Sequence, residues 1–235
     1  MNIAIIPARG GSKRIPKKNI KAFFGKPMIG YAIDAAQKSN LFDHIIVSTD
    51  CPNIKTISES LGASVPFVRP ENLSDDYTGT GAVVNHAIDW FQTHQAQVNY
   101  VCCIYPTVPF LLGDDLKSAF EQLIQQPEKD FVFSVAHYAF PVQRALTFNE
   151  AHDIEMLFSE HAGTRSQDLN DVFHDAGQFY WGKTEAFLKA LPTFSHHSIP
   201  YFMPRSRVMD IDDEEDWQQA ELMYQAYVLK DKKKQ

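Results

Sequence analysis

The amino-acid sequence predicts an α/β protein with a mostly parallel central sheet and helices on both faces. Over the first 136 residues, short apolar runs alternate with segments in which apolar residues recur every three or four positions. Three of the runs end at or beside a turn-forming residue, at Pro7, Asp50 and Pro106. Strands and helices that alternate at this spacing indicate right-handed crossovers, which produce parallel strands covered on both faces.

Each element has its own local signal. A strand is predicted where an apolar run is bounded by turn-forming residues, which gives Asn2–Pro7, His44–Thr49, Val65–Val68, Asn99–Tyr105, Phe131–Ala136, Gly177–Trp181 and the edge strand His197–Met203. A helix is predicted where the apolar period is about 3.6 residues, which gives Met28–Ser39, Asn53–Leu61, a helix with its apolar face from Val83 to Phe91, Asp114–Gln125, Thr184–Ala190 and Asp213–Leu229.

The alternation breaks after His137, where Pro141 and several turn-forming residues leave no clean period. We interpret residues 137–176 as an insertion that forms a substrate flap or a dimer arm. The rest of the chain completes a single domain of residues 1–235. The charged C-terminal segment Lys230–Gln235 is expected to fray.

The loops that follow three predicted strands, after Pro7, Thr49 and Tyr105, belong to the same edge of the sheet. In open α/β sheets, ligands bind beyond the carboxyl ends of the strands. The sequence therefore predicts a binding site at this edge.

The composition restricts the classes of function. The 235 residues are 44% hydrophobic, which supplies a core and argues against disorder. A formal net charge of −7 argues against a general nucleic-acid binder, which needs surplus lysine and arginine. No run approaches the ~18 apolar residues of a membrane span, and the N-terminal run is too short for a signal peptide. The three cysteines, Cys51, Cys102 and Cys103, have no metal or disulfide spacing, so we expect a cytoplasmic protein.

The loop from Pro7 to Asn19 carries the strongest chemical signal. It contains the pair Gly10-Gly11 and five lysines and arginines within ten residues. Glycines allow backbone N–H groups to converge on an anion, and the cations supply the charge that a triphosphate needs. The loop has neither the Walker spacing nor the G-x-G-x-x-G fingerprint, so a solvated basic loop remains the alternative.

The segment Ile6–Asn19, IPARGGSKRIPKKN, resembles the CTP-binding loop of the acylneuraminate cytidylyltransferases, whose pattern is approximately IPARxGSKxxPxKN. The resemblance continues through ordered motifs to about Tyr224. It implies a Rossmann-like sheet order, a homodimer joined by the arm, and transfer of CMP from CTP to a nine-carbon 2-keto acid sugar. It implies that Arg9 and Lys18 are catalytic residues that bind the phosphates. It assigns nucleotide contacts to Ala8, Arg9, Gly10, Gly11, Ser12, Lys18, Asn19 and Arg69.

Asp210 and Asp212 form a second pattern. Two carboxylates two positions apart on extended chain face the same side, and Mg²⁺ takes one or two carboxylates together with phosphate oxygens. Asp212 and Glu215 also fit a capping box for the last helix, so the spacing alone leaves both roles open. The resemblance implies a Mg²⁺ cofactor held by Asp210 and Asp212, with Asp210 the firmer ligand and a catalytic residue.

The sugar-binding motifs lie mainly in the second half of the chain. Arg165 either is a surface charge or binds the sugar carboxylate through two hydrogen bonds. The phrases QRAL, RSQDL and HDAGQFYWG resemble the pseudaminic acid subgroup of the family, and Tyr105 stands where sialate-activating members have glutamine. The resemblance implies pseudaminic acid as the substrate, with N-acetylneuraminate and legionaminate as near alternatives and Kdo as a distant one. It assigns sugar contacts to Tyr105, Gln143, Arg144, Arg165, Gln167, Asp175, Gln178 and Tyr180.

Weaker signals and two rival functions complete the prediction. Asp50 is interpreted as the cap of the helix that follows it, and Arg69-Pro70 as a nucleotide-side loop or a surface turn. A catalytically silent nucleotide-binding protein on the same fold should have lost Arg9, Lys18 or the acidic pair, and all are present. A P-loop kinase or ATPase is disfavoured by the missing Walker spacing.

Overall fold

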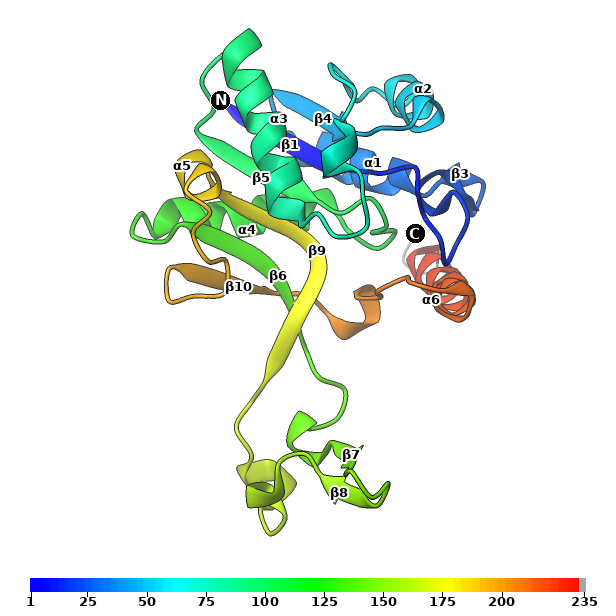
Figure 1. The fold of residues 1–235 in the computed structure, drawn as a ribbon, viewed down its shortest axis with the longest axis vertical. Helices are drawn as coiled ribbons and strands as arrows, with labels where there is room; N and C mark the ends of the chain where they lie inside the picture. The colour runs from blue at the N-terminus through cyan, green and yellow to red at the C-terminus, as the bar shows by residue number, and fades with distance from the viewer. Residues whose placement is uncertain (233–235) are drawn as a thin grey trace.

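The computed structural model describes residues 1–232, with side chains as far as Leu229. Its centre is a six-stranded sheet in the order β10-β6-β9-β5-β1-β4 (Figure 1). Only β9 runs antiparallel to its neighbours, so the expected mostly parallel sheet is confirmed. The strands are β1 Asn2–Pro7, β4 His44–Ser48, β5 Tyr100–Ile104, β6 Phe131–His137, β9 Phe173–Lys183 and β10 Ser198–Phe202.

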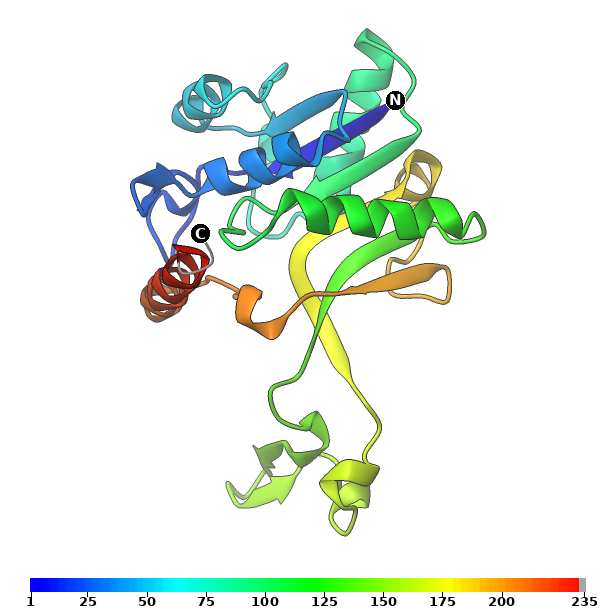
Figure 2. The same cartoon turned by 180° about the vertical axis from the view of Figure 1, so that it is seen from behind.

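Helices cover both faces of the sheet, as the two opposite views show (Figures 1 and 2). On one face lie α1 Ile29–Ser39 and α4 Gly113–Gln125, and on the other lie α3 Thr80–His94 and α5 Thr184–Leu188. The remaining helices are α2 Pro52–Ser60, beside the β4 edge, and α6 Glu214–Lys232, near the loop after β1. The apolar face predicted for α3 is buried in full, from Val83 to Phe91.

Three clusters of buried apolar side chains hold these layers together. Successive strand residues point to opposite faces, so Ile6 packs beneath α1 and α4 together with Trp181, whereas Ile5 packs beneath α3. The third cluster forms where α6 meets the short hairpin of β2 Ala22–Phe23 and β3 Lys26–Pro27. There the rings of Phe23 and Trp217 lie 5.5 Å apart, edge to face. This contact brings the C-terminal segment against the N-terminal loop.

Residues 138–172 leave the sheet between β6 and β9 and form a projecting arm (Figure 1, bottom). The arm contains a small antiparallel hairpin of β7 Leu146–Phe148 and β8 Ile154–Met156. Its other elements are 3-10 turns at Val142–Arg144, Ser159–His161 and Ser166–Asp168. The arm contains no longer helix or strand, and these short elements do not form a hydrophobic core of their own.

A wide bulge interrupts the pairing of β9 with β6. Phe133 pairs with Tyr180 and Val135 pairs with Asp175, so the four residues 176–179 lie opposite the single residue Ser134. Gly177 adopts φ 59° in the bulge, a left-handed conformation that favours glycine. The Ser134 hydroxyl accepts the backbone N–H groups of Gln178 and Phe179 at 3.1 and 3.2 Å. The bulge bends β9 and turns Asp175 back toward Tyr180.

The structure corrects one predicted strand. Val65–Val68 is not a strand, because Pro66 has no N–H to donate to a ladder, and only a single bridge between Ile46 and Ser64 forms there. At the C-terminus, α6 continues to Lys232 instead of fraying from Lys230, and residues 233–235 of the expected tail lie outside the described residues. Within residues 1–232, no helix has the length and apolar character needed to cross a bilayer.

Candidate active site

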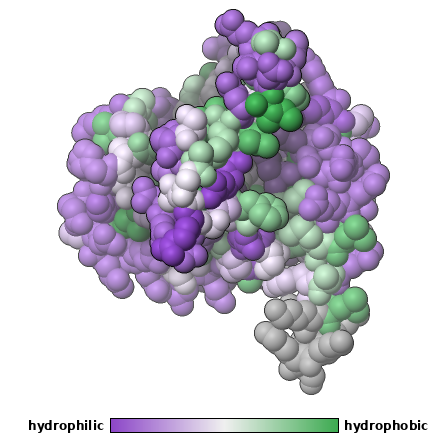
Figure 3. Space-filling model, turned by 90° about the horizontal axis from the view of Figure 1, so that it is seen from below, coloured by the Kyte–Doolittle hydropathy of each residue, from purple (hydrophilic) through white to green (hydrophobic). Residues whose placement is uncertain are grey.

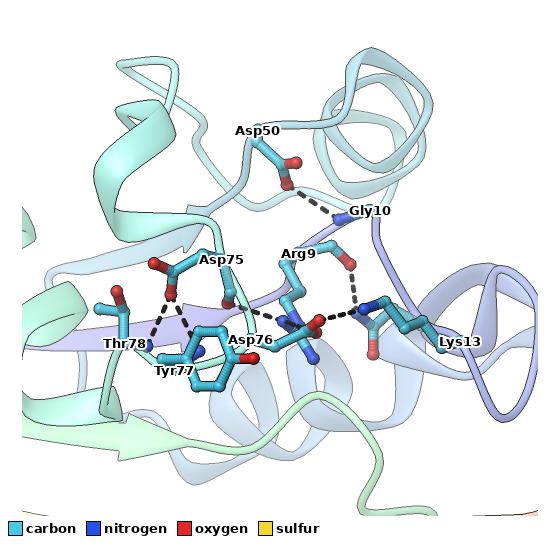
Figure 4. A network of polar contacts seen from close by, with 9 residues as sticks. Arg9, Gly10, Lys13, Asp50, Asp75, Asp76, Tyr77 and Thr78 are labelled. Atoms are coloured by element: carbon cyan, nitrogen blue, oxygen red, sulfur yellow. Dashed lines mark hydrogen bonds and ion pairs between the residues drawn. The ribbon is translucent and has the colours of Figure 1, made fainter.

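The loop after β1 forms one wall of a basic cleft of about 440 Å³. Because β1 ends at Pro7, the loop emerges at the carboxyl end of the parallel strands, where the sequence predicted a site. Arg9 points across the cleft to the segment 71–78, where its Nη1 lies 2.6 Å from the carbonyl oxygen of Asp75 and 2.6 Å from Oδ1 of Asp76 (Figure 4). Lys13 also pairs with the Asp76 carboxylate. These two cations hold the pKa of Asp76 below its usual range.

Asp50 supports the loop and does not cap a helix. Its Oδ1 accepts the backbone N–H of Gly10 at 2.8 Å (Figure 4), and α2 begins without a side-chain cap. A Cβ on Gly10 would lie 2.9 Å from the Cβ of Cys51, which is closer than side chains tolerate, so only glycine fits. The predicted capping role of Asp50 is therefore wrong, and the Gly10 N–H is already bonded within the protein.

Asn19 holds the loop together, and Lys18 joins it to the opposite wall. The buried Asn19 amide donates to the carbonyl oxygen of Arg9 at 3.0 Å. Lys18 donates to the Ile211 carbonyl oxygen at 2.6 Å and lies 3.5 Å from Oδ1 of Asp212. Lys18 and Ile211 are 193 positions apart in the sequence. They meet because α6 packs on the β2-β3 hairpin.

The acidic pair lines the cleft opposite the basic loop. Asp212 pairs with Arg14 at 2.8 Å. The cap of α6 is Asp213, whose carboxylate accepts the N–H groups of Glu215 and Asp216 at 3.0 Å each, so the predicted Asp212–Glu215 capping box is wrong. Since the cap lies one residue later, the Asp212 carboxylate remains directed at the cleft.

Asp210 differs from Asp212 in having no compensating contact. Within the described residues, no hydrogen bond or ion pair reaches its carboxylate, although Lys18 and Arg14 act on it through space. Partial desolvation at the cleft wall, followed by repulsion from Asp212, raises the pKa of Asp210. A carboxylate whose charge is disfavoured in this way gains from a nearby cation.

Arg69 forms the floor of the cleft. It is 5% exposed, its Nε donates to the Ser48 hydroxyl at 3.2 Å, and its Nη2 donates to the Ser48 carbonyl oxygen. Burial lowers the pKa of Arg69 to about 10, and the positive charge of Arg9 contributes in the same direction. The surface-turn alternative for Arg69 is wrong, because the guanidinium is inside the protein.

A second cavity of about 480 Å³, the β9 hollow, adjoins the bulge of β9. Tyr105 and Asp210 line both the basic cleft and the β9 hollow. Tyr180 donates its hydroxyl to Asp175 across the bulge, and the Tyr105 hydroxyl lies 3.3 Å from that of Thr80. Burial raises the pKa of Tyr105, so its phenol stays protonated at neutral pH. The two cavities thus meet at one phenol and one carboxylate.

The structure gathers some of the sequence-predicted residues and separates others. The basic cleft is lined by Arg9, Ser12, Lys18, Asn19, Arg69, Tyr105, Asp210 and Asp212, and the β9 hollow by Tyr105, Asp175, Tyr180 and Asp210. Outside both linings are Ala8, Gly10, Gly11 and Gln178. Ala8 is fully buried and donates its N–H to Ser48, and Gln178 is buried in the bulge, where it donates to the Ala176 carbonyl oxygen at 3.2 Å.

Four predicted sugar-binding residues lie in the arm, away from both cavities of their own chain: Gln143, Arg144, Arg165 and Gln167. Gln143 is buried and donates to the Asn170 carbonyl oxygen at 3.0 Å. Arg144 donates to three arm carbonyl oxygens, and Arg165 pairs with Asp168 at 2.7 Å. These contacts organise the arm itself.

Sequence reasoning missed several residues that line the cavities. Asp75, Asp76, Thr78 and Thr80 line the basic cleft, and His137, His174 and Arg205 line the β9 hollow. Asp76 meets Lys13 from 63 positions away along the chain, so no local pattern announces the contact. Arg205, only five positions before Asp210, could have been found by asking which cations flank the acidic pair.

Comparisons with known proteins agree with this geometry. The sequence matches the family described as Cytidylyltransferase over residues 3–233. It is 44% identical over 223 residues to "Pseudaminic acid cytidylyltransferase" of Campylobacter jejuni serotype O:2, with 95% of this chain and 96% of the relative covered. It is 36% identical over 209 residues to a Helicobacter pylori protein named "Pseudaminic acid cytidylyltransferase and UDP-2,4-diacetamido-2,4,6-trideoxy-beta-L-altropyranose hydrolase", covering 89% of this chain and 40% of that protein.

Among solved structures, the fold is similar to that of CMP:2-keto-3-deoxy-manno-octonic acid synthetase complexed with CTP. The TM-score is 0.68 at 16% sequence identity, and 96% of this chain and 99% of that chain are covered. The sheet order, the basic loop after β1 and a match along nearly the whole sequence point to one conclusion: the chain belongs to the cytidylyltransferase family.

Proposed function

We propose that this protein activates pseudaminic acid, by the reaction CTP + pseudaminic acid → CMP-pseudaminic acid + diphosphate. The observation that carries the proposal is the junction of the basic cleft with the β9 hollow at Tyr105 and Asp210. A transfer between two substrates needs their reacting atoms side by side, and two cavities that share a wall provide this arrangement. The names of the relatives from C. jejuni and H. pylori support the choice of sugar.

The basic cleft is the proposed site of CTP. Its lining includes five cationic side chains, from Arg9, Lys13, Arg14, Lys18 and Arg69, in a protein whose net charge is −7. Charged hydrogen bonds from arginine and lysine are the strongest contacts available to phosphate oxygens. Because Arg9 and Lys13 now share Asp76, the triphosphate has to replace that carboxylate. Arg9 and Lys18 then hold the phosphates while the bond to the departing diphosphate breaks.

The acidic pair fits a magnesium ion. Among the described residues, no group of three or more histidine, cysteine or acidic side chains could hold a metal by itself, and Mg²⁺ commonly takes one or two carboxylates plus substrate phosphates. Asp210 is the proposed firmer ligand, because its carboxylate lacks a compensating contact, and Asp212 is the second. Held by these two carboxylates, Mg²⁺ would supply positive charge that offsets the negative charge on the diphosphate.

The chemical step is an attack by the anomeric hydroxyl of the sugar on the α-phosphorus of CTP, in line with the departing diphosphate. A new O–P bond forms, the bond between the α-phosphorus and the α–β bridging oxygen breaks with its electron pair leaving on the diphosphate, and the proton of the hydroxyl passes to solvent water. Tyr105, at the junction, is positioned to orient the hydroxyl with its own protonated phenol. The protein contributes mainly position and positive charge, which supply much of the rate enhancement in many transfer reactions.

We propose further that two copies form a homodimer through the arm. Leu146, Phe148, Ile154 and Leu157 are 64, 68, 69 and 56% exposed, and the view from below has apolar groups scattered among polar ones (Figure 3). Single exposed apolar residues are normal, but four large ones gathered on and beside the β7-β8 hairpin favour an interaction site, and twofold pairing is the commonest symmetry. Crossing arms would bring the predicted sugar-binding residues of one copy, such as Arg165, to the β9 hollow of the other. We assign the reaction to the cytoplasm, where free thiols such as the three cysteines persist.

The test is diphosphate release from CTP and Mg²⁺ with pseudaminic acid, N-acetylneuraminate, legionaminate and Kdo in parallel. We expect turnover with pseudaminic acid to exceed the others by at least ~100-fold. Preference for another of these acids would refute the sugar assignment and keep the chemistry. CTP binding without turnover of any sugar would favour a catalytically silent nucleotide-binding protein.

A further inference from the structure

Arg205 is the one lysine or arginine among the described residues that line the β9 hollow. The same lining contains the carboxylates of Asp175 and Asp210 and the imidazoles of His137 and His174. The His137 Nδ1 lies 3.1 Å from Asp171, and the His174 Nδ1 lies 2.8 Å from the Asp175 carbonyl oxygen. Arg205 is therefore the permanent positive charge in a cavity that otherwise carries two negative ones.

The proposed sugar brings a third negative charge into this cavity. A 2-keto acid sugar carries its carboxylate on the anomeric carbon, the same carbon whose hydroxyl attacks phosphorus. That carboxylate must lie near Asp210, whose own charge Mg²⁺ would offset, so the sugar carboxylate needs a separate cation when it leaves water. An arginine fork matches a carboxylate with two parallel hydrogen bonds.

Among the described residues, Arg205 uses only one of its donors, which leaves the others for this purpose. Its Nη1 makes one long hydrogen bond of 3.3 Å to the Tyr138 carbonyl oxygen, and no ion pair involves it among the described residues. Its neighbour Arg207 is fully engaged by Asp115, and Arg165 is paired with Asp168 within the arm. Of these arginines in the second half of the chain, Arg205 is the one with an open fork and a place in the cavity.

The backbone around Arg205 also suits a fixed binding point. Arg205 begins the 3-10 turn Arg205–Arg207, five positions before Asp210. The turn is tied to α4 through Arg207 and Asp115, whose side chains are only 14 and 6% exposed. Carboxylate binding and metal binding thus depend on one short segment anchored to the core.

We propose that Arg205 binds the carboxylate of the acid sugar and so sets the position of the anomeric hydroxyl. This inference rests on the proposed function, because it takes an acid sugar as the substrate. Arg205 thus takes the carboxylate-binding role that the sequence left open for Arg165. Asp175 and Tyr180, which also line the hollow, are left for the neutral part of the sugar.

The first experiment measures diphosphate release by Arg205→Ala and Arg205→Lys, with Lys55→Ala on α2 as the control for loss of a surface charge. In Arg205→Ala we expect the KM for pseudaminic acid to rise roughly 10–100-fold, which is the value of a charged hydrogen bond. The KM for CTP should stay within about twofold. Arg205→Lys should recover part of the loss, because it restores the charge without the fork. An unchanged sugar KM in Arg205→Ala refutes the proposal.

The second experiment separates charge recognition from packing. It compares the affinity of each variant for pseudaminic acid and for its 1-carboxamide, in the presence of Mg²⁺ and a non-reacting CTP analogue. The wild type should prefer the acid, and Arg205→Ala should bind acid and amide about equally. If the preference survives in Arg205→Ala but disappears in Arg165→Ala, the carboxylate belongs to the arm and the proposal fails. If the wild type neither binds nor converts any acid sugar, the proposed function itself is wrong.

Discussion

Arg207 and Asp115 form a bidentate ion pair between the segment that carries Asp210 and the N-terminus of α4. The Nη1–Oδ2 distance is 2.5 Å and the Nη2–Oδ1 distance is 2.8 Å. The same carboxylate accepts the Leu112 N–H at 3.0 Å and the Tyr201 hydroxyl at 3.2 Å. One buried acid therefore organises a helix start, an edge strand and the approach to the active site.

Removing one partner of this pair should be costly. In Asp115→Asn or Arg207→Met we expect the free energy of unfolding to fall by about 3 kcal/mol, because the remaining charge is buried without its partner. Urea denaturation of the single variants and of the double variant measures the coupling. The double variant should lose less than the sum of the singles, and strict additivity would show that the pair contributes nothing specific.

Asp76 should compete with CTP for Arg9 and Lys13. In Asp76→Asn we expect the KM for CTP to fall by roughly threefold, because an amide binds the two cations more weakly than a carboxylate does. Arg9→Ala should raise that KM on the order of 100-fold. Asp89→Asn, on the outer part of α3, is the matched control. A higher KM in Asp76→Asn would mean that the segment 71–78 helps to hold the nucleotide.

The two acids of the 210–212 pair should differ in kind. Asp210→Asn should lower kcat by about 1,000-fold or more and raise the Mg²⁺ concentration needed for half-maximal rate. Asp212→Asn should lower kcat by a smaller factor, because Arg14 and Lys18 already neutralise much of the charge of Asp212. Titration of each variant with Mg²⁺ checks this order. Activity that persists after removal of divalent cations by a chelator would contradict the assigned metal role.

Ser134, opposite the bulge of β9, can be compared with another buried serine, Ser58 on α2. Ser134→Ala should destabilise the fold by about 2 kcal/mol, because two buried N–H groups lose their shared acceptor. Ser58→Ala should be nearly neutral, since the buried Ser58 hydroxyl has no hydrogen-bond partner among the described groups. Thermal unfolding of both variants makes the comparison. Equal losses of stability in the two variants would show that the cost comes from the cavity left by the hydroxyl and not from the lost hydrogen-bond acceptor.

Crossed arms predict that two inactive variants rescue each other. Arg9→Ala disables the basic cleft, and Arg165→Ala disrupts the arm by removing the ion pair with Asp168, so in a mixed dimer one site receives both defects and the other receives neither. Co-refolded variants should then recover about a quarter of wild-type activity. The mass of the wild type by analytical ultracentrifugation should correspond to two chains. No recovery from a mixture of proven mixed dimers would exclude sharing of the arms.

Much of the fold could be predicted because buried strands and amphipathic helices are local patterns. β1 matches its predicted bounds, and the apolar face of α3 is evident in the sequence residue by residue. Val65–Val68 failed because one proline outweighed an apolar run. The antiparallel direction of β9 was not predicted, since a strand has the same pattern in either direction.

The site was harder to predict, for two physical reasons. Caps depend on the residue at which a helix begins, and a shift of one position moved that role from Asp212 to Asp213. Contacts between distant segments leave no local trace, as with Arg9 and Asp75, which are 66 positions apart. The basic loop and the acidic pair were found because their chemistry is concentrated in short runs.

The pairing of β6 with β9 gives the arm an unusual independence. His137 pairs with Phe173, so the two ends of the arm leave the sheet side by side. For the rest of the fold, the arm is therefore only a long connection between two paired strands. Such a connection can be lengthened, shortened or exchanged without changing the strand order. The arm is thus a replaceable module: if it forms the proposed dimer, changes in its length or sequence would alter the pairing of the two copies while the sheet and the basic cleft stay intact.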